Sequence, residues 1–182
     1  MAKLVSKTYG EALFTIAMEE DKSTLFLEEV EGILKILKEN PDFDKMMQHP
    51  GIPKQEKLAM IEQAFAGHAS DEITGFLKIV VSKERYGELG EIFRYFIDKV
   101  KEVRRIGIAH VTTAVELSED QKAQVQARLI ETTDFRTVEM HYQVDPQIIG
   151  GMIIRIGDRV VDSSIRSKLN DLTKQLLQIQ LG

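Results

Sequence analysis

The chain has 182 residues, a formal net charge of −5 and a hydrophobic content of 43%, which is enough for one ordinary core or two small ones. The negative net charge argues against a nucleic-acid-binding protein, because such proteins need a basic surface to displace counterions. The sequence contains no cysteine, so disulfides and thiolate metal sites are excluded. No apolar run approaches the roughly 18 residues that a spanning helix needs, so we expect no direct insertion into a membrane.

Apolar residues recur at helical spacing through the first hundred residues. Asn40-Pro41 is expected to end one helix, and Ser70 is a candidate N-cap for another. A short helical piece is expected near residues 43–47. The apolar stripes lie within residues 5–16, 27–37, 58–65, 73–80 and 89–103. Short amphipathic helices separated by turns pack as an antiparallel bundle, which we predict for residues 1–105.

The apolar period changes near Arg105, and residues 106–182 are predicted to form a small α+β domain. The β-branched, alternating stretches 107–117, 138–144, 151–156 and 160–162 are typical of strands. Ser118 and Gln121 have capping-box spacing at the start of a helix that runs to about Glu131. Ser163 or Ser164 is expected to cap a last helix. The order β-α-β-β-β-α predicts a sheet with helices over one face, so the fold class is α+β.

No residue pattern indicates catalysis or a cofactor. The sequence has no phosphate-binding GxxxxGK[ST] loop, and its four histidines lack metal-ligand spacing. The pair Gly150-Gly151 is best explained by a tight bend before a strand. Ser163 and Ser164 follow Asp162, but helix capping explains these serines better than nucleophilic chemistry does. We therefore predict no catalytic, cofactor-binding or metal-binding residues.

Two of the predicted helices carry more apolar surface than a one-sided helix needs. In the first helix, Leu4, Phe14 and Met18 form a second, weaker cluster on the side away from its main stripe. In the helix that follows Ser70, apolar residues cover an arc of roughly 200°, against the ~100° stripe of an ordinary surface helix. Either both helices are central in the bundle, or their surplus apolar side lines a groove for a partner helix.

Two motifs resemble a known family. Residues 150–164 read GGMIIRIGDRVVDSS, and the pattern members are Gly150, Gly151, Arg155, Gly157, Asp158, Asp162 and Ser164. This stretch resembles the C-terminal signature of the ATP synthase delta subunits, which include the mitochondrial oligomycin-sensitivity-conferring protein. The N-terminal YGEALF is similar to the family's Tyr-Ala-x-Ala-like pattern. Gly10 replaces its usual alanine, and Ser163 stands where many members carry glycine.

The resemblance implies a non-catalytic stator subunit of the proton-transporting ATP synthase. It implies an N-terminal six-helix bundle that binds the alpha subunit's N-terminal helix in a groove between the first and fifth helices. The C-terminal domain, residues 106–182, would contact the b-subunit stalk at residues that the sequence does not specify. The protein would be monomeric within the complex, at the cytoplasmic face of the cell membrane, and would need no cofactor. The expected neighbourhood of this groove is Tyr9, Ala12, Leu13, Ile16, Phe76, Ile79 and Val80. Some of these residues are expected to belong to the bundle core instead, and the sequence does not distinguish them.

Two alternatives to this assignment remain at the level of sequence. One is a helical adaptor of another complex, which would co-purify without ATP synthase subunits. The other is a small enzyme of unknown type, which a deep polar pocket with convergent ionisable groups would favour.

Overall fold

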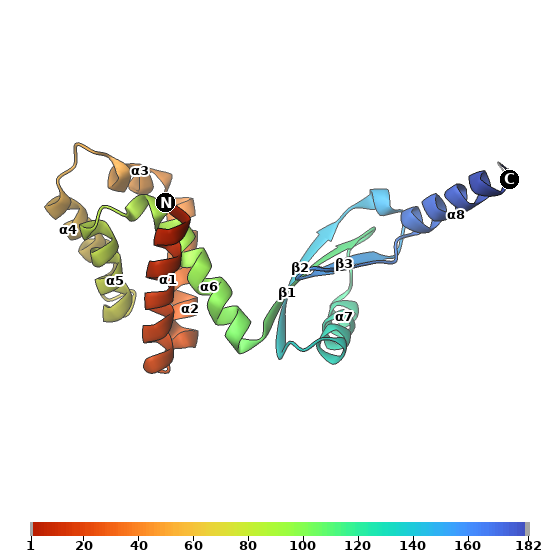
Figure 1. The fold of residues 1–182 in the computed structure, drawn as a ribbon, viewed down its shortest axis with the longest axis horizontal. Coiled ribbons are helices and arrows are strands. Elements are labelled where there is room, and N and C mark those ends of the chain that lie inside the picture. Colours follow the sequence, from red (N-terminus) through yellow and green to blue (C-terminus); the bar gives the residue numbers. More distant parts are fainter. Residues whose placement is uncertain (1, 181–182) are drawn as a thin grey trace. The chain divides into compact units, whose positions relative to one another are not determined.

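A computed structural model describes residues 2–180 of the chain. The chain divides into two compact units, Met1–Val100 and Lys101–Gly182. Helices alone build the first unit over the described residues, whereas the second combines a sheet with helices. Figure 1 shows the elements of each unit. The α+β fold class predicted from the sequence is confirmed.

The first unit is built from short helices that begin and end where the sequence places its breaks. Asn40 separates the second helix from the third, and Ser70 Oγ accepts a hydrogen bond from the Ile73 amide, 3.4 Å away. The elements are α1 (Ala2–Glu19), α2 (Ser23–Glu39), α3 (Pro41–Gln48), α4 (Lys54–Phe65), α5 (Asp71–Ser82), the 3₁₀ turn η1 (Tyr86–Glu88) and α6 (Leu89–Arg104).

Aromatic side chains hold α1, α5 and α6 together. The rings of Phe76 and Phe93 stack at 6.2 Å, and Tyr9 meets Phe76 edge-on at 6.4 Å. Lys22, just beyond the end of α1, forms an ion pair with Glu72 in the first turn of α5. The end of α1 therefore lies beside the start of α5, so these two helices are antiparallel neighbours.

The second unit is a four-stranded mixed sheet with one crossover helix. The strand order is β2-β1-β3-β4, in which only the β1–β2 pair is parallel. A parallel pair needs a long crossover connection, which α7 supplies. The elements are β1 (Ile106–Thr113), α7 (Glu119–Thr132), β2 (Thr137–Val144), the 3₁₀ turn η2 (Pro146–Ile148), β3 (Met152–Ile156), β4 (Arg159–Asp162) and α8 (Ile165–Gln180).

Two expectations for this unit are corrected. The first strand ends at Thr113, not Leu117, because Thr113 Oγ1 donates to the Val115 carbonyl at 2.7 Å and turns the chain. The expectation that both helices cover the sheet is wrong for α8. Leu129 of α7 packs on Ala109 and Val138 in the sheet core. Helix α8 instead contacts η2 and extends from the end of the sheet (Figure 1).

The glycine pair of the motif makes the approach between β3 and α8 possible. Gly151 has a φ of +76°, and a Cβ there would lie 2.4 Å from the Ser163 carbonyl oxygen. The Gly150 carbonyl accepts from the Ile165 amide at 3.0 Å, at the first residue of α8. The tight bend predicted at Gly150-Gly151 is therefore confirmed, and glycine is required by both the backbone conformation and the space.

Replacing Gly151 with alanine should loosen the junction between β3 and α8. We expect Gly151→Ala to reduce the opening free energy of the Ser163 and Ile165 amides by ~2 kcal/mol or more, since strain and a backbone clash combine. Gly157→Ala is the matched control, because Gly157 also has positive φ (+54°) but open space around it. Gly157→Ala should lower the local opening free energy by about 1 kcal/mol. Native-state hydrogen exchange measures both, and equal losses would contradict the steric argument.

Candidate partner-binding surfaces

The structure divides the seven predicted groove residues into two groups. Leu13 and Val80 are 1% and 0% exposed, and Phe76 is buried between Tyr9 and Phe93. These three side chains belong to the core of the first unit, so they are the members of the expected groove neighbourhood that pack inside the bundle. The breadth of the apolar arc on α5 thus reflects burial from several sides. The remaining four residues are half-buried or exposed: Tyr9, Ala12, Ile16 and Ile79.

These four residues define what we call the α1–α5 surface. Tyr9 lies at its base, in edge-on contact with Phe76 of α5. Ala12 and Ile16 follow on the same side of α1, one turn and two turns further along the helix, and Ile16 is 38% exposed. Ile79 on α5 is 53% exposed. Two adjacent helices therefore present a small residue and two branched apolar side chains that the described part of the chain leaves uncovered.

A hollow beside Ile79 extends this apolar region towards α4. It measures about 500 Å³ and lies open to solvent. The sequence did not predict the α4 side of this hollow, because Leu58 belongs to the apolar stripe within residues 58–65, and such a stripe is expected to pack inside the bundle. The lining residues are Leu58, Ala59, Glu62, Lys78, Ile79 and Ser82.

The opposite side of α1 is occupied by α6. A Cβ on Gly10 would lie 2.5 Å from the Tyr95 Cδ1 atom, and the Tyr95 hydroxyl donates to the Glu11 carboxylate at 2.9 Å. The departure from alanine at position 10 therefore makes room for the Tyr95 ring. This packing directs the other flank of α1, with Ala12 and Ile16, away from α6.

Helix α8 carries a second uncovered apolar surface. Its leucines recur at spacings of three and four residues, which is the spacing of a coiled-coil seam. Every member of the stripe is exposed, whereas a helix folded onto a core would bury them. We call this stripe the α8 seam: Ile165, Leu169, Leu172 and Leu176.

The motif residues around Asp162 hold α8 in place. The Asp162 carboxylate accepts from the Ser167 hydroxyl at 2.6 Å and from the Ser164 amide at 2.8 Å. Ser164 Oγ accepts from the Ser167 amide at 3.2 Å, which confirms the predicted serine cap. The hydrogen bonds from Ser167 and Ser164 lower the pKa of Asp162. In this chain, these members of the motif build the β4–α8 junction.

The described residues contain no group of three or more side chains able to hold a metal ion. His110 and His141 are register partners in β1 and β2, and their rings stack with centroids 5.1 Å apart. Burial raises the pKa of the Tyr86 phenol in the first unit, with a further contribution from Asp44. None of the helices in the described part of the chain has the length and apolar character to cross a membrane.

The fold and its two uncovered apolar surfaces are those of a binding protein with a helical unit and a mixed α/β unit. The family described as "ATP synthase delta (OSCP) subunit" matches residues 5–176. The chain belongs to this family, and it is a non-catalytic stator subunit of ATP synthase.

Comparison with individual proteins agrees with this assignment. The chain is 52% identical over 182 residues to ATP synthase subunit delta of Lachnoclostridium phytofermentans, with 100% of both chains covered. It is 36% identical to ATP synthase subunit delta of Halothermothrix orenii over 175 residues, 96% of this chain and 91% of that protein. Its fold is similar to a chain of the Toxoplasma gondii mitochondrial ATP synthase hexamer, with a TM-score of 0.70, 16% identity and coverage of 94% and 97%.

The lowered pKa of Asp162 predicts how the β4–α8 junction responds to acid. Because this pKa is lower in the folded than in the unfolded chain, the stabilisation is complete at neutral pH. This stabilisation by the ionised Asp162 carboxylate is lost as the pH falls below about 4, the pKa of an unfolded aspartate, and through the lower pKa that Asp162 has in the folded chain. The melting temperature of Asp162→Asn should therefore be below that of the unsubstituted protein at pH 7, and the difference should shrink towards pH 3. Asp158→Asn, in the β3–β4 turn, is the control, and a pH-independent difference for Asp162→Asn would contradict the linkage.

Proposed function

We propose that this subunit links the catalytic head of ATP synthase to its peripheral stalk through two separate surfaces. The α1–α5 surface would bind the N-terminal segment of an alpha subunit as a helix, and the second unit would bind the b subunit. The observation that carries the proposal is the pair of uncovered apolar surfaces, one on each unit. The residues Ala12, Ile16 and Ile79 in the first unit and the α8 seam in the second are exposed.

The α1–α5 surface has the features of a groove for an amphipathic helix. Ala12 has a small side chain and allows close approach of a partner backbone, while Ile16 near the end of α1 and Ile79 near the end of α5 are exposed apolar side chains at different points along the two helices. An amphipathic helix buries its apolar face against such neighbours through anchors one or two turns apart. In this proposal Tyr9 contributes its exposed edge, and the six helices of the first unit act together as one antiparallel bundle.

The load on a stator explains why such a contact has to be strong. The rotor's torque would turn the catalytic head as well, unless a link holds it still. A nanomolar dissociation constant corresponds to about −12 kcal/mol. Several buried apolar anchors can supply this even after the cost of ordering a flexible segment is subtracted.

The α8 seam is the best candidate for the b-subunit contact. A helix with apolar residues at this spacing pairs with another helix, because its apolar side is otherwise left in water. Lys168 lies beside the seam on one side and Arg166 on the other, at about 100° per residue. The partner helix would then carry acidic residues along the edges of its own apolar stripe. In this proposal one partner binds residues 1–105 and the other binds residues 106–182, and the complex would hold the protein at the cytoplasmic face of the membrane.

A charge in the α1–α5 surface should weaken alpha binding without unfolding the unit. We expect Ala12→Asp to retain helicity by circular dichroism but to weaken binding of an alpha N-terminal peptide by about 2 kcal/mol or more, as at a buried hot spot. Met18→Asp is the control, since Met18 is exposed on the same helix roughly 120° away. Isothermal titration of the full chain measures both, and unchanged affinity for Ala12→Asp would remove Ala12 from the site.

A charge in the α8 seam should weaken binding of the b subunit. We expect Leu169→Asp to reduce the affinity for a soluble b-subunit fragment at least tenfold, or about 1.4 kcal/mol, because the carboxylate would be buried against an apolar stripe. Asn170→Asp adds the same charge to the adjacent exposed position, about 100° away around the helix. It should bind normally, and similar losses for the two variants would argue against the seam.

A further inference from the structure

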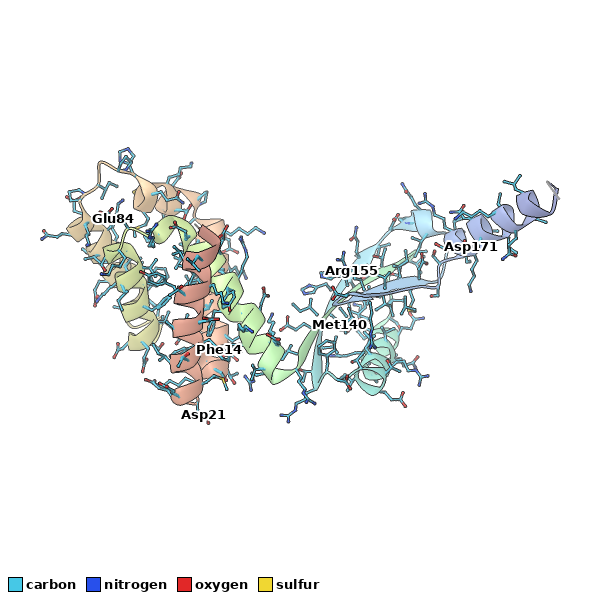
Figure 2. The ribbon with its side chains drawn as sticks, viewed as in Figure 1. Phe14, Asp21, Glu84, Met140, Arg155 and Asp171 are labelled. Atoms are coloured by element: carbon cyan, nitrogen blue, oxygen red, sulfur yellow. The ribbon has the colours of Figure 1, made fainter. Side chains whose placement is uncertain are left out.

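One face of the sheet in the second unit is left open. Helix α7 packs on the face that carries Ala109, Val138 and Ile156. Because side chains alternate along a strand, His110 and Arg155 lie on the other face. Figure 2 shows Arg155 on the side of the sheet away from α7 and Met140 on the side of α7. Apart from the last turn of α6, whose Lys101 reaches Glu139, no described helix of this unit lies on the open face.

A row of exposed side chains crosses this open face. His110 is the register partner of His141 in β2 and of Arg155 in β3, and Arg155 is the partner of Val160 in β4. The two imidazole rings stack at 5.1 Å with 21° between their planes. All four residues are exposed, and we call them the open-face row: His141, His110, Arg155 and Val160.

On this face the carboxylates have hydrogen-bonding or ion-pair partners within the described residues, whereas the Arg155 guanidinium has no ion-pair partner among them. The Glu139 carboxylate is held by the buried Lys101 ammonium at 2.8 Å, and Asp162 accepts hydrogen bonds from two serines. Among the residues that the structure describes, no carboxylate forms an ion pair with Arg155. An ordinary solvated sheet face intersperses charges of both signs. Here the acidic groups have partners, while a guanidinium and two imidazoles remain free to donate outward.

We propose that the open-face row is a second contact for the b subunit and binds carboxylate side chains of that partner. A planar guanidinium donates to a carboxylate through two parallel hydrogen bonds, and each imidazole adds an N–H donor. Val160 offers apolar contact at the end of the row. Strand β4 leads directly into α8, so the row and the α8 seam are connected by the same segment. The inference rests on the proposed function, because it names b as the occupant.

The test is charge reversal at Arg155 in the full chain, with a soluble b-subunit fragment as the probe. We expect Arg155→Glu to weaken binding at least tenfold, as when a close charge pair is replaced by repulsion. Arg155→Lys keeps the positive charge but cannot donate two parallel hydrogen bonds to one carboxylate, so it should lose less affinity than Arg155→Glu. Arg128→Glu is the matched control, because Arg128 is exposed on α7, which covers the other face, and it should bind normally. Circular dichroism melting establishes that each variant is folded.

The outcomes separate this inference from the proposed function. If the unsubstituted protein fails to bind the b fragment, the proposed b contact itself is wrong. If it binds and Arg155→Glu binds equally well, the open-face row is wrong while the α8 seam can still stand. His110→Ala, which removes the N–H donor, provides an independent variant should Arg155→Glu melt early, with an expected loss of about threefold. Unchanged binding in this folded variant, together with unchanged binding in Arg155→Lys, would also overturn the proposal.

Discussion

Each unit of this protein has more apolar helix surface than its own core can cover, and this constraint determines the rest of its architecture. A unit of about a hundred residues has a high ratio of surface to volume. Its core can take one side of each helix, and Phe26, Phe93 and Phe96 are fully buried in the core of the first unit. Side chains beyond that side, such as Ile79 on α5 and the α8 seam, remain in water until another protein covers them. Apolar surface of this kind marks a binding protein.

The recognisable C-terminal motif has a structural role in this chain. Gly151 lets the backbone approach Ser163, and Asp162 and Ser164 accept the free amides at the start of α8. Together they orient α8 away from the sheet, where it cannot bury its own seam. The motif therefore identifies the family through residues that position α8, while the proposed contact residues lie outside the motif, with the exception of Arg155.

The two units also differ in how their surfaces are suited to binding. The α1–α5 surface is small and apolar, with one half-buried aromatic residue at its base. The second unit combines an apolar helix with a polar row on an open sheet face. An apolar seam supplies affinity, whereas charged groups beside it favour one partner and one register. A stator link needs both properties, since it has to hold under load and also seat the stalk in one orientation.

The sequence by itself determined the local elements of the fold. Turn residues and caps such as Asn40, Ser70 and Ser118 act within a few residues of themselves, so their effects can be read from spacing. The family motif could likewise be recognised from the sequence alone. The candidate contact residues could be found from the sequence only as a group. Leu13, which is buried, and Ala12, which is exposed, are neighbours in the same apolar stretch, so the pattern does not distinguish them.

Only the tertiary structure decided which members of that group are free to bind. Whether an apolar residue is core or surface depends on the neighbouring helix, and neighbours come from distant parts of the chain. Tyr95 of α6 covers one flank of α1, so Ala12 and Ile16 remain on the other. The register of β1 with β2 and β3 similarly brings His110, His141 and Arg155 together. Strand pairing over such separations leaves no local signal, which is why the open-face row could not be predicted from the sequence.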